Sequence, residues 1–145
     1  KETYAKNAAA YIEELRALDA EIRAQVETIP PERRVLVTNH ESFGYFADRY
    51  GFTVAGAVIP SANSSAETSA QQLAALIDTI RSSGAPAIFL ETGANPKLAE
   101  QIAAETGVQV VTGLYTHSIT APEGDAPSYL DMLRRNAALI TAALR

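Results

Sequence analysis

Apolar residues recur along the chain in two different periods, and the change between them separates one long helix from an alternating region. In residues 1–28 they return at steps of three and four, the spacing of one face of an α-helix. The positions concerned are Tyr4, Ala8, Tyr11, Ile12, Leu15, Leu18, Ile22 and Val26. Pro30 and Pro31 end the pattern, because proline lacks an amide donor and restricts the residue before it. A helix of this length, about 40 Å at 1.5 Å per residue, fits either an ordinary packed helix or a spine that joins this domain to another.

After the prolines, short apolar runs alternate with amphipathic segments. Strands are expected at 34–38, 52–59, 86–91 and 108–114, and the helices that follow them at 41–50, 66–83, 95–106 and 128–144. Gly51 and Gly107 each follow an expected helix and suit the left-handed position that ends helices. Strands that alternate with helices predict an α/β fold of three αβα layers around a four-stranded parallel sheet, preceded by the long N-terminal helix.

The first strand leads directly into the most informative segment. Val35, Leu36 and Val37 form an apolar run typical of a strand covered on both faces. Asn39 is a suitable N-cap for the next helix, which is therefore expected to begin at once. His40 then lies at the carboxyl end of a parallel strand, which is where ligands bind in open α/β sheets.

Composition narrows the possible functions. The 145 residues carry a net charge of −5 without a basic cluster, so nothing indicates nucleic-acid binding. Cysteine is absent, which excludes disulfides and thiolate metal sites. Neither a phosphate-binding glycine motif nor a G-x-S-x-G elbow occurs, and nothing in the spacing selects a serine triad. No apolar run is long enough to span a membrane and no signal peptide is present, although a first residue of Lys1 suggests a piece of a longer chain.

The two histidines are the strongest candidates for chemistry. His40 follows the first expected strand and His117 the fourth, so both are expected on the same side of a parallel sheet. Neutral imidazole is the commonest metal-binding side chain and suits Zn²⁺. We therefore predict that His40 and His117 are metal ligands; the alternative is that each is a surface or capping histidine.

Four acidic residues have less specific interpretations. Glu91 ends the third expected strand on the same rim, where it could be a ligand, orient a ligand histidine, or cap the following helix; capping or orientation is favoured. Glu123 and Asp125 fit a solvated acidic loop better than a metal site. Glu67 fits the first turn of its helix, where the dipole favours an acid.

Several segments resemble a known family. Residues 38–51, TNHESFGYFADRYG, resemble the TNHDAFGYFAKRYG block of solute-binding proteins from zinc and manganese ABC importers. Residues 56–60, 86–91, 114–119 and 128–136 are similar to later blocks of that family, so the resemblance covers nearly the whole chain. It implies two α/β lobes joined by one long helix, with the metal between them. Residues 1–29 then match the linking helix and residues 30–145 the C-terminal lobe, while the N-terminal lobe is absent.

The resemblance also implies a ligand set. His40 matches a family ligand, and His117 stands where the family has an aspartate. If His117 replaces that aspartate, the site favours Zn²⁺ over Mn²⁺, which prefers oxygen. Glu91 matches a family glutamate that usually lies near the metal. The implied protein is extracytoplasmic, periplasmic or lipid-anchored, and delivers its ion to an ABC permease.

Two other function classes stay open from the residues alone: a small α/β enzyme that uses His40 as acid or base, and an adhesin or interaction domain for which metal is incidental. A turnover screen, combined with the chelator sensitivity of any activity, separates the enzyme from a metal-binding module, while the adhesin predicts partner binding that chelation does not affect. The long helix carries an apolar stripe that could also pair with a second copy, so a homodimer is a further expectation.

Overall fold

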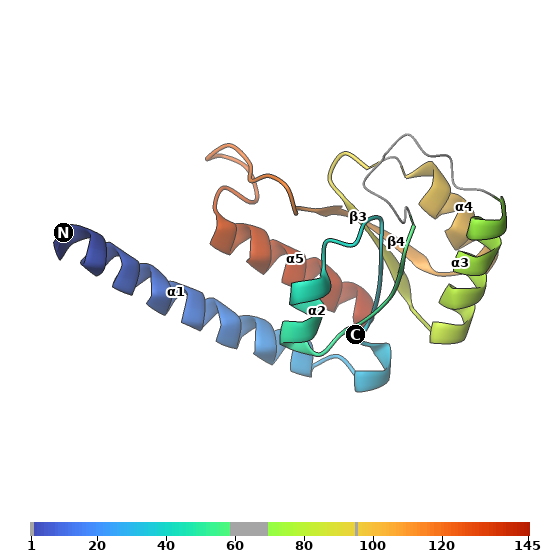
Figure 1. The fold of residues 1–145 in the computed structure, drawn as a ribbon, viewed down its shortest axis with the longest axis horizontal. Coiled ribbons are helices and arrows are strands. Elements are labelled where there is room, and N and C mark those ends of the chain that lie inside the picture. The colour runs from blue at the N-terminus through green and yellow to red at the C-terminus, as the bar shows by residue number, and fades with distance from the viewer. Residues whose placement is uncertain (1, 59–69, 95) are drawn as a thin grey trace.

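The computed structural model describes residues 2–58, 70–94 and 96–145. They form a four-stranded sheet between two layers of helices, and one helix extends far beyond the rest (Figure 1). The helices are α1 (Glu2–Glu27), α2 (Gly44–Tyr50), α3 (Ala70–Ser83), α4 (Lys97–Thr106) and α5 (Tyr129–Leu144), with a 3-10 turn at Pro31–Arg33. The strands are β1 (Val35–Thr38), β2 (Thr53–Ala57), β3 (Ala87–Glu91) and β4 (Gln109–Leu114).

The sheet has the order β2-β1-β3-β4, and every neighbouring pair is parallel, as predicted. The chain runs outward from β1 to β2, then crosses to the other side of β1 with β3. Strand order therefore reverses between β1 and β3, the point at which open α/β sheets bind ligands outside the carboxyl ends of their strands. The ends of β1, β3 and β4 lie side by side there, with Thr38 paired to Phe89 and Glu91 to Leu114.

Each face of the sheet is covered by its own helices. α1, α2 and α5 pack on one face, where the core includes Leu18, Phe89 and Ile140. α3 and α4 cover the other face around Val37, Ile80 and Ile102. β3 is buried along its whole length, which explains its unbroken apolar sequence. The predicted three-layer fold is confirmed.

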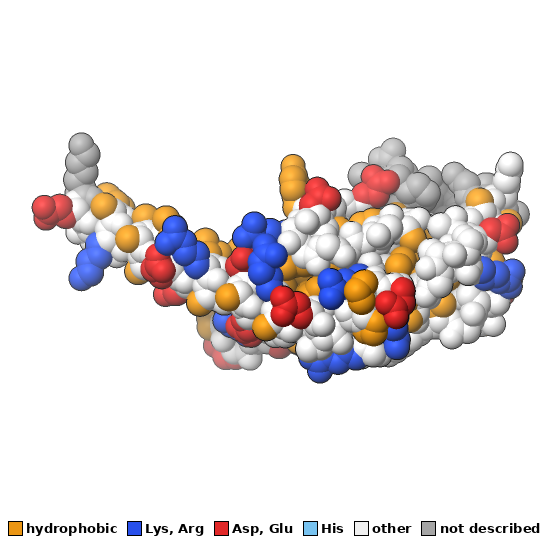
Figure 2. Space-filling model, turned by 90° about the horizontal axis from the view of Figure 1, so that it is seen from below, with side chains coloured by type: hydrophobic (Ala, Val, Ile, Leu, Met, Phe, Trp, Pro, Cys, Tyr) orange, Lys and Arg blue, Asp and Glu red, His pale blue; other side chains and the backbone are white. Residues whose placement is uncertain are grey.

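The two halves of α1 have different environments. Its second half buries Leu18, Ile22 and Val26 against the core, whereas residues 2–14 are all exposed and project from the body of the molecule (Figure 1). Apolar side chains lie open along this projecting half (Figure 2), including Tyr4 at 81% exposure. No helix in the described ranges is long and apolar enough to cross a membrane.

An ion pair joins the buried half of α1 to α2. Arg49 donates from Nε and Nη2 to the two carboxylate oxygens of Asp19, at 2.9 and 2.8 Å. This guanidinium lowers the pKa of Asp19 to about 2. Burial, followed by the Asp19 carboxylate, raises the pKa of the neighbouring Tyr50 to about 12.

The expected start of α2 was wrong. The helix begins at Gly44 rather than at residue 41, and Phe43, not Asn39, holds its N-cap position without a side-chain cap. Asn39 is not free to cap, because its Oδ1 accepts the backbone N–H of Glu91 at 2.9 Å. The predicted left-handed glycines are confirmed, with φ of 74° at Gly51 and 77° at Gly107.

Three expectations concern segments outside the described residues. They are the start of the helix expected at residue 66, the place of Glu67 in its first turn, and the start of the next helix at Asn95.

Candidate metal centre

The rim formed by the ends of β1, β3 and β4 brings three predicted site residues together. Glu91, the last residue of β3, is 7% exposed, and its Oε2 points toward both histidines. His117 Nε2 lies 3.4 Å from this oxygen, and His40 Nδ1 lies 3.9 Å from it. Residues far apart in the sequence thus meet at one carboxylate oxygen because parallel strands end on the same edge.

Ser42 fixes the orientation of the Glu91 carboxylate. Its hydroxyl donates to Oε1 at 2.6 Å. Since Oε1 is engaged in this way, Oε2 is the oxygen left to face the imidazoles. Ser42 is available because the chain stays irregular from Asn39 to Phe43 instead of entering the helix directly.

Asn39 sets the orientation of the His40 ring. Because its Oδ1 accepts the Glu91 N–H, its Nδ2 is the atom that faces His40 Nδ1, at 2.7 Å. An amide nitrogen can only donate, so Nδ1 accepts and a neutral His40 ring carries its proton on Nε2. An ion that binds through Nδ1 therefore has to displace this hydrogen bond.

One of the two distances to Glu91 matches the spacing of two ligands on one Zn²⁺ ion, but the rim is not a complete metal site. Two ligands of a tetrahedral Zn²⁺ with bonds of about 2.0–2.1 Å are about 3.4 Å apart, which is the distance from His117 Nε2 to Glu91 Oε2. However, no group of three or more His, Cys, Asp or Glu side chains among the described residues is already arranged to hold a metal ion. His117 is also 76% exposed. The three side chains therefore form a small group of donor atoms that is open to solvent on the side of His117.

The loop after β4 carries His117, and one of its acidic residues is not merely solvated as expected. Asp125 accepts from Tyr115 Oη at 3.0 Å and pairs with Arg135 at 2.6 Å. The hydrogen bond to Asp125 is the main reason that the pKa of Tyr115 is raised. Asp125 therefore fastens the loop to α5 and does not take part in the rim.

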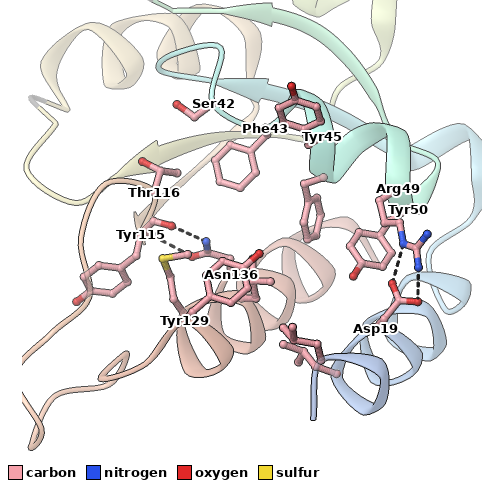
Figure 3. Close-up of a pocket in the computed structure, with 15 residues that line it drawn as sticks. Asp19, Ser42, Phe43, Tyr45, Arg49, Tyr50, Tyr115, Thr116, Tyr129 and Asn136 are labelled. Atoms are coloured by element: carbon pink, nitrogen blue, oxygen red, sulfur yellow. Dashed lines mark hydrogen bonds and ion pairs between the residues drawn. The ribbon is translucent and has the colours of Figure 1, made fainter. Parts of the chain in front are cut away.

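A hollow of about 390 Å³ opens beside the rim, between α1, α2, α5 and the end of β4. Figure 3 shows Ser42 and Thr116 at one end of it and the ion pair of Asp19 with Arg49 at the other. Aromatic rings make up much of its wall: Phe43, Tyr45, Phe46, Tyr50, Tyr115 and Tyr129. Ser42, which holds the Glu91 carboxylate, and Thr116, which precedes His117, thus line a hollow with a largely aromatic wall on the same side as α1.

Sequence reasoning missed the polar residues that support the rim. Asn39 was interpreted as a cap, while Ser42, Arg135 and Asn136 received no role. One signal was present for Asn136, since an amide at a buried position of an amphipathic helix requires a partner. It is 2% exposed, and its partner is the backbone of Tyr115.

Comparison with known proteins gives a consistent result. The family model described as zinc-uptake complex component A, periplasmic (ZnuA), matches residues 1–143. The iron-binding protein YfeA of Yersinia pestis is 37% identical over 132 residues, which are 91% of this chain and 42% of YfeA. The manganese-binding lipoprotein MntA of Halalkalibacterium halodurans is 32% identical over 99% of this chain and 47% of its own length.

Solved structures agree in fold. A Mn-bound point mutant of a periplasmic metal-binding protein from Candidatus Liberibacter asiaticus has a TM-score of 0.87 and 32% identity, over 99% of this chain and 53% of its own. The periplasmic zinc-binding protein TroA of Treponema pallidum has a TM-score of 0.85 and 32% identity, over 97% of this chain and 52% of its own. The chain spans about half the length of these relatives.

Proposed function

This chain belongs to the ZnuA family, described as the periplasmic component of a zinc-uptake complex, and from that premise we propose that it is part of an extracytoplasmic solute-binding protein of a transition-metal ABC importer. The protein captures an ion and passes it to a membrane permease. No bond is made or broken in the cargo beyond its coordination bonds, so the role requires no catalytic residue.

One observation carries the proposal for the site. His40 and His117, which are far apart in the sequence, both lie within 3.9 Å of Glu91 Oε2 on the rim where ligands bind in this type of sheet. His40 and His117 are the proposed ligands. Glu91 supports them and, through Oε2, is a possible third ligand.

The ligand types favour Zn²⁺ over Mn²⁺. Two imidazoles are borderline donors that suit Zn²⁺, whereas Mn²⁺ prefers carboxylate and other oxygen ligands. The named relatives are described as binding iron or manganese and TroA as binding zinc, so the fold alone does not determine the cargo.

The rim accounts for only part of a coordination sphere. We propose that residues 30–145 are the C-terminal lobe of a two-lobed protein, that residues 1–29 form its linking helix, and that the other lobe supplies the remaining ligands. The length of the relatives, about twice that of this chain, and the open outer side of His117 both favour this arrangement.

In the chain alone, the projecting half of α1 is proposed to pair with a second copy. Tyr4, Tyr11 and Ile12 are 81, 43 and 45% exposed and lie on one face of this half. Sedimentation at rising protein concentration is expected to show a dimer, and a strict monomer at the highest concentration would contradict it.

The test of the metal site is a Zn²⁺ titration of the chain in competition with a chromophoric chelator. His40→Ala and His117→Ala are each expected to weaken Zn²⁺ binding by about tenfold or more, since even partners of ligands cost 10–100-fold. Glu123→Gln, a change of an exposed acid in the same loop as His117, is the control and is expected to bind as the original chain does. Unchanged Zn²⁺ affinity in both histidine variants would remove the site assignment.

A further inference from the structure

The backbone that leads to His117 is held by a buried side chain of α5. Asn136, which is 2% exposed, accepts the Tyr115 N–H on Oδ1 at 2.9 Å and donates from Nδ2 to the Tyr115 carbonyl at 2.7 Å. These two bonds replace the pairing that an adjacent strand would give at this point (Figure 3). They fix the chain two residues before His117.

The neighbouring Arg135 holds both ends of the same loop. Its Nη1 lies 2.6 Å from Asp125 Oδ2 near the end of the loop, and its Nε donates to the Gly113 carbonyl before the start, at 3.4 Å. The guanidinium also lies over the Tyr115 ring, 5.6 Å from its centre, and that tyrosine donates to Asp125. One planar group therefore joins the two ends of the loop to α5.

The loop is also closed by its own hydrogen bonds. The Thr120 N–H donates to the Ala126 carbonyl at 2.8 Å, and the Ala126 N–H donates to Thr120 Oγ1 at 3.2 Å. His117 lies between the two fixed ends, and its side chain is 76% exposed. Packing around the imidazole does not set its position, so the fixed loop has to do so.

We infer that Arg135 and Asn136 are positioning residues that hold His117 at its distance from Glu91 and so preorganise the rim for the ion. This inference rests on the proposed function, because it requires His117 to be a ligand. If the loop were loose, it would lose conformational entropy when the ion orders His117, and this loss would lower the affinity for the ion. The effect acts through His117 alone.

A double-mutant cycle with Zn²⁺ tests this. Arg135→Ala is expected to weaken Zn²⁺ binding about tenfold, the lower end of the range for groups that support ligands, and to cause no further loss when His117→Ala is already present. Arg134→Ala is the matched control, because the adjacent arginine pairs with Glu21 and Asp131 and not with the loop. It is expected to leave Zn²⁺ affinity unchanged.

A second measurement needs no metal. The backbone order parameter of residue 117, from ¹⁵N relaxation, is expected to fall in Arg135→Ala and to recover in part in Arg135→Lys, which keeps the charge beside Asp125. Two results would overturn the inference. In the first, Arg135→Ala weakens Zn²⁺ binding by the same factor whether or not His117→Ala is present. In the second, His117→Ala weakens Zn²⁺ binding but Arg135→Ala leaves it unchanged. If His117→Ala itself has no effect, His117 is not a ligand; the proposed function then fails at this residue, and that failure is distinguishable from a failure of the positioning inference.

Discussion

Replacing Asp19 with Asn removes a charge at the junction of α1 and α2 while keeping the size of the side chain. In the folded chain this carboxylate accepts two hydrogen bonds from Arg49 and one from Arg23, at 3.2 Å. Arg49 lowers the pKa of Asp19 from an ordinary value near 3.8 to about 2. We expect the free energy of unfolding of Asp19→Asn at pH 7 to be lower than that of the original chain.

The magnitude follows from the pKa. A shift of nearly two units corresponds to about 2.5 kcal/mol at 1.36 kcal/mol per unit, but the Arg49 side chain is 59% exposed. Solvent screens such a pair, which reduces the expected loss to about 1 kcal/mol. With a urea m-value of about 2 kcal/mol/M, this loss lowers the unfolding midpoint by about 0.5 M.

The pH dependence provides the sharper test. A carboxyl group whose pKa is lowered by folding contributes stability above its unfolded value, near pH 3.8, and that contribution disappears as the pH falls through about 2. Urea unfolding of both chains at pH 7, 4, 3 and 2 is expected to show their difference shrinking across the lower part of this range. A difference that stays constant from pH 7 to pH 2 would refute the electrostatic explanation. Glu13→Gln, which removes an exposed pair on the projecting half of α1, is the control.

Two further comparisons use urea unfolding at pH 7. Ile22→Ala is expected to destabilise the chain by about 2–5 kcal/mol because Ile22 is fully buried. Ile12→Ala, on the projecting half of α1, is expected to change the free energy of unfolding by no more than about 0.5 kcal/mol. Equal losses would contradict the division of α1 into two environments. Gly51→Ala is expected to cost about 1–2 kcal/mol because φ is 74° there, while Gly44→Ala, with open space around it and no positive φ, is expected to stabilise by about 0.4–1 kcal/mol. A neutral Gly51→Ala would show that this turn relaxes without strain.

The fold could be predicted because its signals are local and repeated. Each apolar run, amphipathic segment and glycine stop contributes independently to the same α/β pattern, and parallel pairing follows from alternation. The segment 39–43 could not be predicted in this way. Asn39 is a good N-cap by type, but the backbone N–H of Glu91 competes for its side-chain oxygen, and that contact exists only after β1 and β3 pair.

The candidate site was predictable to the level of its rim. Strand ends in a parallel sheet determine which residues share an edge, so His40, His117 and Glu91 could be placed together from the sequence. The supporting contacts depend on side-chain directions across tertiary packing. Ser42 contacts Glu91, and Arg135 contacts Asp125, only after the loops and helices have packed against the sheet.

The uninterrupted helix α1 has a mechanical consequence. It contains neither glycine nor proline from Glu2 to Glu27, so it has no built-in hinge. Its thirteen outermost residues form a lever of about 20 Å fixed at one end in the core. A tilt of about 5° at the fixed end moves the free tip by almost 2 Å. Any small shift of α1 against α2 and α5 is therefore amplified in a structure that contacts the N-terminal end of the helix.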